Sequence, residues 1–151
     1  MSDTIKITEA DIDAVVGWTV IRAARQAGRI VAMALKEHGL TPVEFGVLSQ
    51  LAAANGELTQ AEVARAAEIR AQSVAPIIDG LDGRGLIRRE GVRGRGRSGR
   101  LFLSEDGAAL LNKAFPDVLA TNELFVDGDS QTLVNDQLLA FLSRSRQTEQ
   151  T

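Results

Sequence analysis

The strongest local constraint on this chain is the tetrapeptide Thr41-Pro42-Val43-Glu44. Threonine followed three residues later by glutamate is the pattern of a helix-capping box. Proline is favoured at the first helical position, because its missing N–H would have no intrahelical partner there. We therefore expect a helix from Pro42 to about Ala54, closed by Asn55-Gly56. The same box recurs at Thr59 to Glu62 and predicts a second, short helix.

A third short helix is expected from about 71 to 84. Its inner face repeats at helical spacing through Val74, Ile77, Ile78 and Leu81. Pro76 lies inside it, where proline removes one backbone hydrogen bond and crowds the preceding turn. With Ser73 as the N-cap, Pro76 would be the third helical residue, whose N–H needs no partner. With a start near Ala71, Pro76 would kink the helix, and the sequence leaves both alternatives open. Three short helices with tight connections predict a helix-turn-helix.

After Gly85 the pattern changes from helical to strand-like. Leu86 to Glu90 and Arg100 to Leu103 predict two strands of a hairpin, joined by a loop of alternating arginine and glycine. Residues 84–100 hold seven arginines and one acidic residue, whereas the remainder holds 10 basic and 19 acidic residues, within a total charge of −3. We expect a short cationic element set into an acidic body, an arrangement that orients an encounter with DNA.

The apolar residues that follow Thr8 predict one long helix from about 9 to 38. Thr8 and Asp11 form a capping box with aspartate in place of the usual glutamate, and helical spacing continues to Gly39. At about 1.5 Å per residue this helix would be about 45 Å long, more than one small domain needs to cover its core. A second set of apolar residues lies on its other faces. We therefore expect it to pack on its own domain and on a second copy of the chain.

Two further helices are expected after the hairpin. Ser104 is a helix N-cap and predicts a helix to about residue 125, with a bend at Pro116. Asp127-Gly128-Asp129 breaks this helix. A last amphipathic helix is predicted at about 130–143, followed by a polar tail that we expect to be frayed.

Missing residue types exclude several classes of function. The chain has no cysteine and one histidine, His38, which leaves no disulfide framework, no Cys/His zinc site and no thiol nucleophile. The glycines between the arginines lack the following helix and lysine of a phosphate-binding loop, and there is no Ser/His/Asp set with supporting context. We therefore expect neither an enzyme nor a bound cofactor or metal. No apolar run reaches the roughly 18 to 20 residues of a membrane-spanning helix and the opening residues are polar, so we expect a cytoplasmic protein.

The order of helix, turn, helix and basic hairpin is that of a winged helix, and specific residues extend the likeness. They are Leu40-Thr41-Pro42 through Leu48, Leu58-Thr59-Gln60-Ala61-Glu62-Val63-Ala64, Ser73-Val74, Ile78-Asp79, Leu81, Gly85-Leu86-Ile87-Arg88-Arg89 and Leu103-Ser104-Glu105-Asp106-Gly107. Over about residues 40–107 the chain resembles the MarR-type transcriptional regulators. The resemblance implies a mainly α fold with a small β-hairpin wing, organised as a single domain over 1–151. Within it, helices at 9–38 and 105–145 would form a dimerisation body, and residues 41–104 a winged helix-turn-helix DNA-binding lobe.

The same resemblance implies a sequence-specific DNA-binding transcriptional regulator. Such proteins act as homodimers on pseudo-palindromic operators in double-stranded DNA, most commonly as repressors, and a small-molecule effector releases them. Our alternative is a winged-helix module for non-specific DNA, RNA or protein binding without effector control. The chain departs from the family at two points. Arg95 and Arg97 stand where the wing usually carries the Asp and Arg that brace it, and Pro76 replaces a polar or basic residue of the recognition helix.

Eight residues are candidates for DNA contact, at the start of the third helix and along the hairpin. They are Arg70, Gln72, Ser73, Arg88, Arg93, Arg95, Arg97 and Arg100. Side chains at a helix N-terminus reach bases or phosphates, and wing arginines neutralise phosphates or enter a minor groove. Plainer roles stay open for several of these positions. An Arg/Gly run is often only a solvated loop, Ser73 is a candidate cap, and Arg88 or Arg89 is available for an ion pair within the fold. Arg84 is a candidate C-terminal cap of the recognition helix.

Five residues are candidates for the wall of an effector pocket, which the family places between the dimer helices and the DNA-binding lobe. They are Trp18, Met33, His38, Phe45 and Phe115. The plainer alternative is that the aromatic residues pack in the core and that the histidine caps a helix or lies at the surface. An effector bound there would act by a population shift, favouring a dimer whose recognition helices no longer match the groove spacing.

Overall fold

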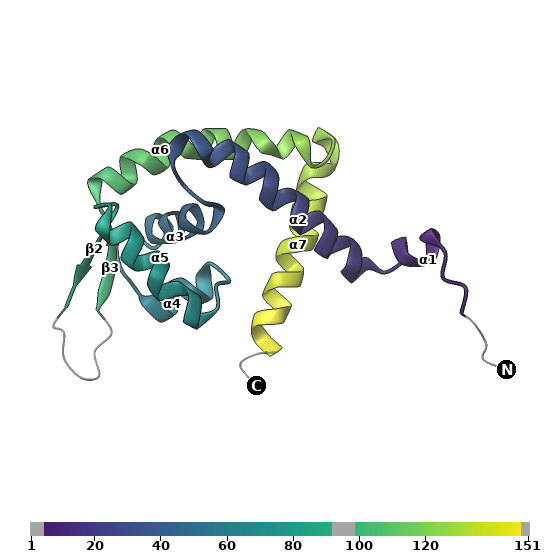
Figure 1. The fold of residues 1–151 in the computed structure, drawn as a ribbon, viewed down its shortest axis with the longest axis horizontal. Helices are drawn as coiled ribbons and strands as arrows, with labels where there is room; N and C mark the ends of the chain where they lie inside the picture. Colours follow the sequence, from purple (N-terminus) through teal and green to yellow (C-terminus); the bar gives the residue numbers. More distant parts are fainter. Residues whose placement is uncertain (1–4, 92–98, 149–151) are drawn as a thin grey trace.

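The computed structural model describes residues 5–91 and 99–148. In chain order its elements are α1 (Glu9–Asp13), α2 (Val16–Leu35), η1 (Lys36–His38), α3 (Pro42–Ala53), β1 (Leu58–Thr59), α4 (Gln60–Ala66), α5 (Ala71–Gly83), β2 (Ile87–Glu90), β3 (Arg100–Leu103), α6 (Glu105–Ala120), η2 (Thr121–Leu124) and α7 (Gly128–Thr148). Figure 1 shows α2 and α6 side by side, the cluster of α3, α4 and α5 beneath one end of them, and α1 projecting at the other end. The fold is mainly helical with a small sheet, as the sequence predicts.

The capping boxes that the sequence predicts are all formed. The Thr41 N–H donates to Glu44 Oε2 at 2.8 Å, and the Glu44 N–H donates to Thr41 Oγ1 at 3.2 Å. The same reciprocal pair links Thr59 and Glu62 at 2.7 and 3.2 Å. Each box satisfies backbone groups that a helix start leaves without partners. The first turns of α3 and α4 are therefore fixed locally, before any tertiary contact.

The prediction of one helix over 9–38 is wrong, because the helix is interrupted. α1 ends at Asp13, Val15 is extended with φ −83° and ψ 94°, and α2 begins at Val16 without a side-chain cap. Two β-branched residues followed by Gly17 lower helix propensity at this point. No side chain of α1 is buried, so no packing opposes the break. The predicted end is confirmed, since Gly39 takes the left-handed conformation with φ 63° after η1.

The recognition helix α5 begins at Ala71 and its N-cap is Arg70, so the alternative with Ser73 as N-cap is wrong. Pro76 is the sixth helical residue, and the Gln72 carbonyl therefore receives no backbone N–H from it. The helix is held instead by its inner face. Val74, Ile78 and Leu81 are buried in the core. Tertiary packing of this face outweighs the local cost of proline.

The sheet has three strands in the order β1-β3-β2, all antiparallel. The predicted hairpin of β2 and β3 is confirmed, with Ile87 opposite Leu103 and Glu90 opposite Arg100. The strand β1 is an addition, and its pairing sets Leu58 opposite Leu101. Two residues are too few to show a strand period in sequence. This short strand attaches the wing to the start of α4.

Ser104 joins the base of the wing to α6. Its hydroxyl accepts from the Gly107 N–H at 2.9 Å and donates to the Gly85 carbonyl at 2.6 Å, and its own N–H donates to the Leu86 carbonyl at 3.1 Å. Gly107 is buried against this turn, and a Cβ added there would lie 2.0 Å from the Leu86 carbonyl oxygen. Glycine is therefore required at this point of contact between α6 and the wing.

Of the two C-terminal helices, α6 is shorter than the sequence predicts and α7 is longer. α6 contains Pro116 and ends at Ala120, where η2 continues to Leu124. α7 begins at Gly128, inside the predicted break, and continues to Thr148, so the expectation of a frayed tail from Arg144 is wrong as far as 148. None of the helices in the described ranges is both long and apolar enough to cross a membrane.

The core lies where α3, α4, α5 and the hairpin meet the near ends of α2 and α6. Its largest fully buried side chains are Leu35, Leu48, Leu51, Ile78, Leu81, Ile87, Val47, Val63 and Val74. By contrast, no side chain of α1 is buried, and none is buried in the part of α7 whose side chains are described. The core thus supports the helix-turn-helix and leaves both ends of the chain outside it.

Candidate nucleic-acid interface

The exposed start of α5 carries three of the predicted DNA-contact residues. Arg70, Gln72 and Ser73 are the N-cap, second and third residues of this helix, and all three are exposed. Within the described part of the chain, the side chains of these three residues form no hydrogen bond or ion pair. The fold uses the opposite face of the helix, so this face is available to a partner.

Arg88 and Arg89, neighbours on β2, have different roles. Arg89 forms an ion pair with Asp79 and lies 3.2 Å from Asp82, both on α5. Arg89 therefore holds the wing against the recognition helix. The sequence left either Arg88 or Arg89 available for an ion pair within the fold, and the structure gives the pair with α5 to Arg89. Arg88 points to the other face of the strand. Its side chain is 62% exposed, and its guanidinium lies 6.0 Å from the ring centre of Phe102 and 3.7 Å from Glu90.

Two further arginines of the basic segment are bound within the fold. Arg100 lies 3.1 Å from Glu57, with about half of its side chain exposed. Arg84 is the C-cap residue of α5, but its guanidinium donates to the Gly39 carbonyl at 2.9 Å and to Glu44 at 3.3 Å. It therefore links the end of α5 to the start of α3. Arg93, Arg95 and Arg97, and with them the departure from the family's wing brace, lie outside the described residues.

The start of α4 carries a carboxylate whose pKa the fold lowers. The Thr59 N–H and then its hydroxyl donate to Glu62, and these hydrogen bonds, with smaller contributions from Arg100 and Arg65, lower the pKa of Glu62 from its usual 4.5. A negative charge here suits the helix N-terminus. Glu62 therefore serves the fold of the lobe.

The candidate effector residues fall into two groups. Phe45 and Phe115 stack with ring centres 6.1 Å apart, and His38 Nε2 lies 2.6 Å from Asp117 Oδ2. These contacts bring α3 and η1 against α6, and Asp117 is a partner that the sequence pattern did not indicate.

Trp18 and Met33 lie apart from that group. Trp18 lines a hollow of about 610 Å³ together with Ile7, Ile12 and Val15. The guanidinium of Arg25 lies 5.6 Å from the centre of the Trp18 ring. Met33 is 76% exposed on α2. Of the five residues, Trp18 alone lines this hollow, and the common effector pocket stays a prediction.

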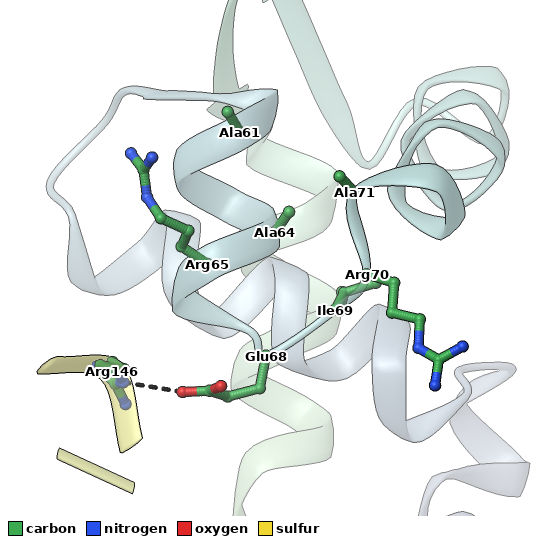
Figure 2. Close-up of a pocket in the computed structure, with 8 residues that line it drawn as sticks. All are labelled: Ala61, Ala64, Arg65, Glu68, Ile69, Arg70, Ala71 and Arg146. Carbon is green, nitrogen blue, oxygen red and sulfur yellow. Dashed lines mark hydrogen bonds and ion pairs between the residues drawn. The ribbon is translucent and has the colours of Figure 1, made fainter. Parts of the chain in front are cut away.

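A second hollow, of about 630 Å³, lies between the turn of the helix-turn-helix and α7. Residues between 61 and 71 and Arg146 line it. Figure 2 shows Arg65 and Arg70 leaving it on opposite sides, while Glu68 and Arg146 face each other across one end. The sequence pattern gave no indication of this hollow, because its two walls are far apart in the chain.

A helix-turn-helix followed by a hairpin that its third helix holds in place is a winged helix-turn-helix, here set between long terminal helices. The sequence model of the MarR family matches residues 38–98. Over this region the chain is similar to the MarR-family winged-helix regulators in both sequence and fold.

Solved structures share this fold. The transcriptional repressor CouR, of Rhodococcus jostii RHA1, was solved on a 23-mer DNA duplex. It is 27% identical, with a TM-score of 0.71, and the match covers 96% of this chain and 99% of that one. MosR of M. tuberculosis is 25% identical with a TM-score of 0.70, over 89% and 98% of the two chains. BpsR of Bordetella bronchiseptica has the same fold, with 22% identity and a TM-score of 0.75 over 92% and 98%. A search of curated proteins gives no match.

Proposed function

We propose that the protein is a homodimeric repressor that reads a pseudo-palindromic operator in double-stranded DNA. The observation that carries this proposal is the exposed start of α5, where the side chains of Arg70, Gln72 and Ser73 form no hydrogen bond or ion pair with the described residues. The N-terminal residues of a recognition helix are those that contact base edges in the major groove. Arg88 and the arginines of the wing would add phosphate contacts on either side. No catalytic activity is part of the proposal.

The dimer is supported by the apolar surface of the flanking helices. Leu124, Leu133 and Phe141 are between 52% and 68% exposed, and α1 and α2 expose a similar series. α7 has no extended packing against any other element within the described chain. Exposed apolar surface of this extent marks an interface. We base the division into dimerisation helices and a DNA-binding lobe at 41–104 on the contrast between the exposed apolar side chains of these helices and the buried ones of the lobe.

Operator reading by a dimer also agrees with the DNA-bound neighbour. CouR was solved on a 23-mer duplex. Two half-sites one helical turn apart, about 10 base pairs, fit on a duplex of that length. We propose the same arrangement for this chain, with one α5 in each of two successive major grooves.

Effector control is the second part of the proposal. CouR was also solved with p-coumaroyl-CoA, and 6-hydroxynicotinic acid regulates DNA binding by BpsR. In this chain, the contact of Phe45 with Phe115 joins α6 to the lobe, and that of His38 with Asp117 joins α6 to η1, just before the lobe. An effector that altered these contacts would change the angle between lobe and flanking helices, and so the distance between the two recognition helices.

Selection of bound duplexes from a random DNA pool at near-physiological salt tests the proposal. We expect a two-fold-symmetric winner, bound about 10³-fold or more tighter than a scrambled duplex. Gln72→Ala should mainly relax sequence preference, whereas a double replacement of Arg95 and Arg97 by alanine should weaken binding and flatten its salt dependence. Binding without sequence preference would instead favour the non-specific DNA, RNA or protein-binding module.

A further inference from the structure

The hollow beside the helix-turn-helix is spanned by one ion pair. Arg146 Nε donates to Glu68 Oε1 at 2.8 Å, and about half of each side chain is exposed. Arg146 lies in the last turn of α7, and Glu68 lies in the turn between α4 and α5. Because α7 has no extended packing on the other elements of the described chain, a direct tie to the lobe such as this pair carries weight. Figure 2 shows the two side chains meeting at one end of the hollow.

The backbone around Glu68 is fixed by hydrogen bonds of its own. Glu68 has a left-handed conformation with φ 54°, and the following Ile69 N–H donates to the Ala64 carbonyl at 2.8 Å. Such a bond closes the C-terminus of α4. Arg70, the N-cap of α5, is only two residues beyond Glu68. A displacement of Glu68 is therefore passed to the first residues of the recognition helix instead of being absorbed by a slack loop.

We propose that Arg146 is a positioning residue for DNA reading. By holding Glu68, it sets the start of α5 relative to α7, and thus relative to the dimer of which α7 is a part. The inference rests on the proposed function, because it concerns how a dimeric reader holds its two recognition helices. The separation of these helices must match the half-site spacing. A dimer without the ion pair would tolerate a wider range of spacings.

The test compares duplexes that carry the selected half-sites at the preferred separation and at one base pair more or less. Arg146→Gln should weaken binding at the preferred separation about two- to five-fold, the range expected of an exposed ion pair, and should bring the three separations closer in affinity. Glu68→Gln should do the same. The double variant should be no worse than either single one, because both remove one interaction. Arg146→Lys keeps the charge and should restore most of the preference.

Matched controls separate this effect from a general loss of charge. Arg22 and Asp13 form another exposed ion pair, at 2.6 Å, between α2 and α1. Arg22→Gln and Asp13→Asn should leave the spacing preference unchanged. Sedimentation should give each variant the mass of the wild-type oligomer.

A direct contact of Arg146 with DNA phosphate predicts a different pattern and would overturn the proposal. In that case Arg146→Gln would weaken binding equally at every separation and lower the salt slope by about one, while Glu68→Gln would tighten binding. Unchanged spacing preference in both single variants would overturn it as well. If the wild-type protein itself selected no symmetric operator, the proposed function would fail and this inference with it.

Discussion

The DNA-binding lobe buries its large apolar side chains, whereas the helices on either side of it expose many of theirs. Leu35 apart, the largest fully buried side chains all belong to the lobe, and they close its core without help from α1 or α7. The flanking helices expose theirs, as with Leu133 at 64% and Phe141 at 52%. The start, turns and wing base of the lobe are hydrogen-bonded, and its core needs only the near ends of α2 and α6 to close. Under the proposed function, a second copy of the chain would cover the apolar surface of the flanking helices.

The largest effect is expected where the lobe meets α6. Gly107→Ala would place a Cβ 2.0 Å from the Leu86 carbonyl oxygen, which is backbone that no side-chain rotation can clear. We expect the free energy of unfolding to fall by about 3 kcal/mol, as for severe overpacking, measured by urea denaturation.

Gly80 provides the matched control for this substitution. It is also helical, and a Cβ there would meet nothing within 4 Å. Gly80→Ala should therefore raise stability by about 0.5–1 kcal/mol through helix propensity. A stable Gly107→Ala protein would mean that α6 and the wing base are not closely packed.

The next effect tests whether the flanking helices need a partner. Phe141→Glu puts a charge on the exposed apolar face of α7, and we expect the dimer dissociation constant to rise about 30-fold, as for loss of a central interface residue. Sedimentation equilibrium measures it. Val43 is also an exposed apolar side chain, but it lies on α3 in the lobe, at 42% exposure. Val43→Glu should leave the mass unchanged, and equal dissociation by both variants would contradict the contrast between lobe and flanks.

Helix caps give a smaller comparison of the two regions. Thr59→Ala removes the cap of α4, which carries the buried Val63, and should lower the free energy of unfolding by about 1 kcal/mol. Thr8 caps α1 with the same reciprocal geometry, but α1 buries no side chain. Thr8→Ala should cost less than about 0.5 kcal/mol, since α1 can fray without disturbing the core. An equal loss in both variants would show that α1 folds together with the rest of the protein.

The sequence predicted the lobe more accurately than its flanks, and the physical reason is the range of the interactions. A capping box such as Thr41 to Glu44 lies within four residues, so the sequence alone predicts it. The change from helical to strand-like spacing after Gly85 is equally local and predicts the hairpin. The break at Val15 has a local component in Val15-Val16-Gly17, but it also depends on the absence of packing around α1, which the sequence does not show. α7 continues to Thr148, beyond the point where apolar residues stop recurring at helical spacing, so the sequence pattern could not predict where this helix ends.

The candidate site divides in the same way. The free start of α5 follows from its position in the helix-turn-helix, which the sequence places. The sequence could not tell which of Arg88 and Arg89 forms an ion pair within the fold. That depends on Asp79 and Asp82 of α5 lying opposite the strand face that carries Arg89. The contacts of His38 with Asp117 and of Glu68 with Arg146 join residues 79 and 78 positions apart, so only the fold could reveal them.

The smallest effect concerns the acid sensitivity of the two capped helices. Hydrogen bonds from Thr59 lower the pKa of Glu62 below its unfolded value of 4.5, so above pH 4.5 the charged carboxylate contributes its full stabilisation. As the pH falls from there through the lower pKa of the folded state, the unfolded chain takes up the proton first and this stability is lost. Glu62→Gln keeps the cap's shape without the charge, so its free energy of unfolding should fall less steeply between about pH 5 and 3 than that of wild type.

Thr8 lowers the pKa of Asp11 in the same way, but on a helix that does not support the core. Asp11→Asn should therefore leave the slope unchanged, and urea titrations across this pH range would show whether a charge coupled to the lobe and one coupled only to α1 differ as the structure requires.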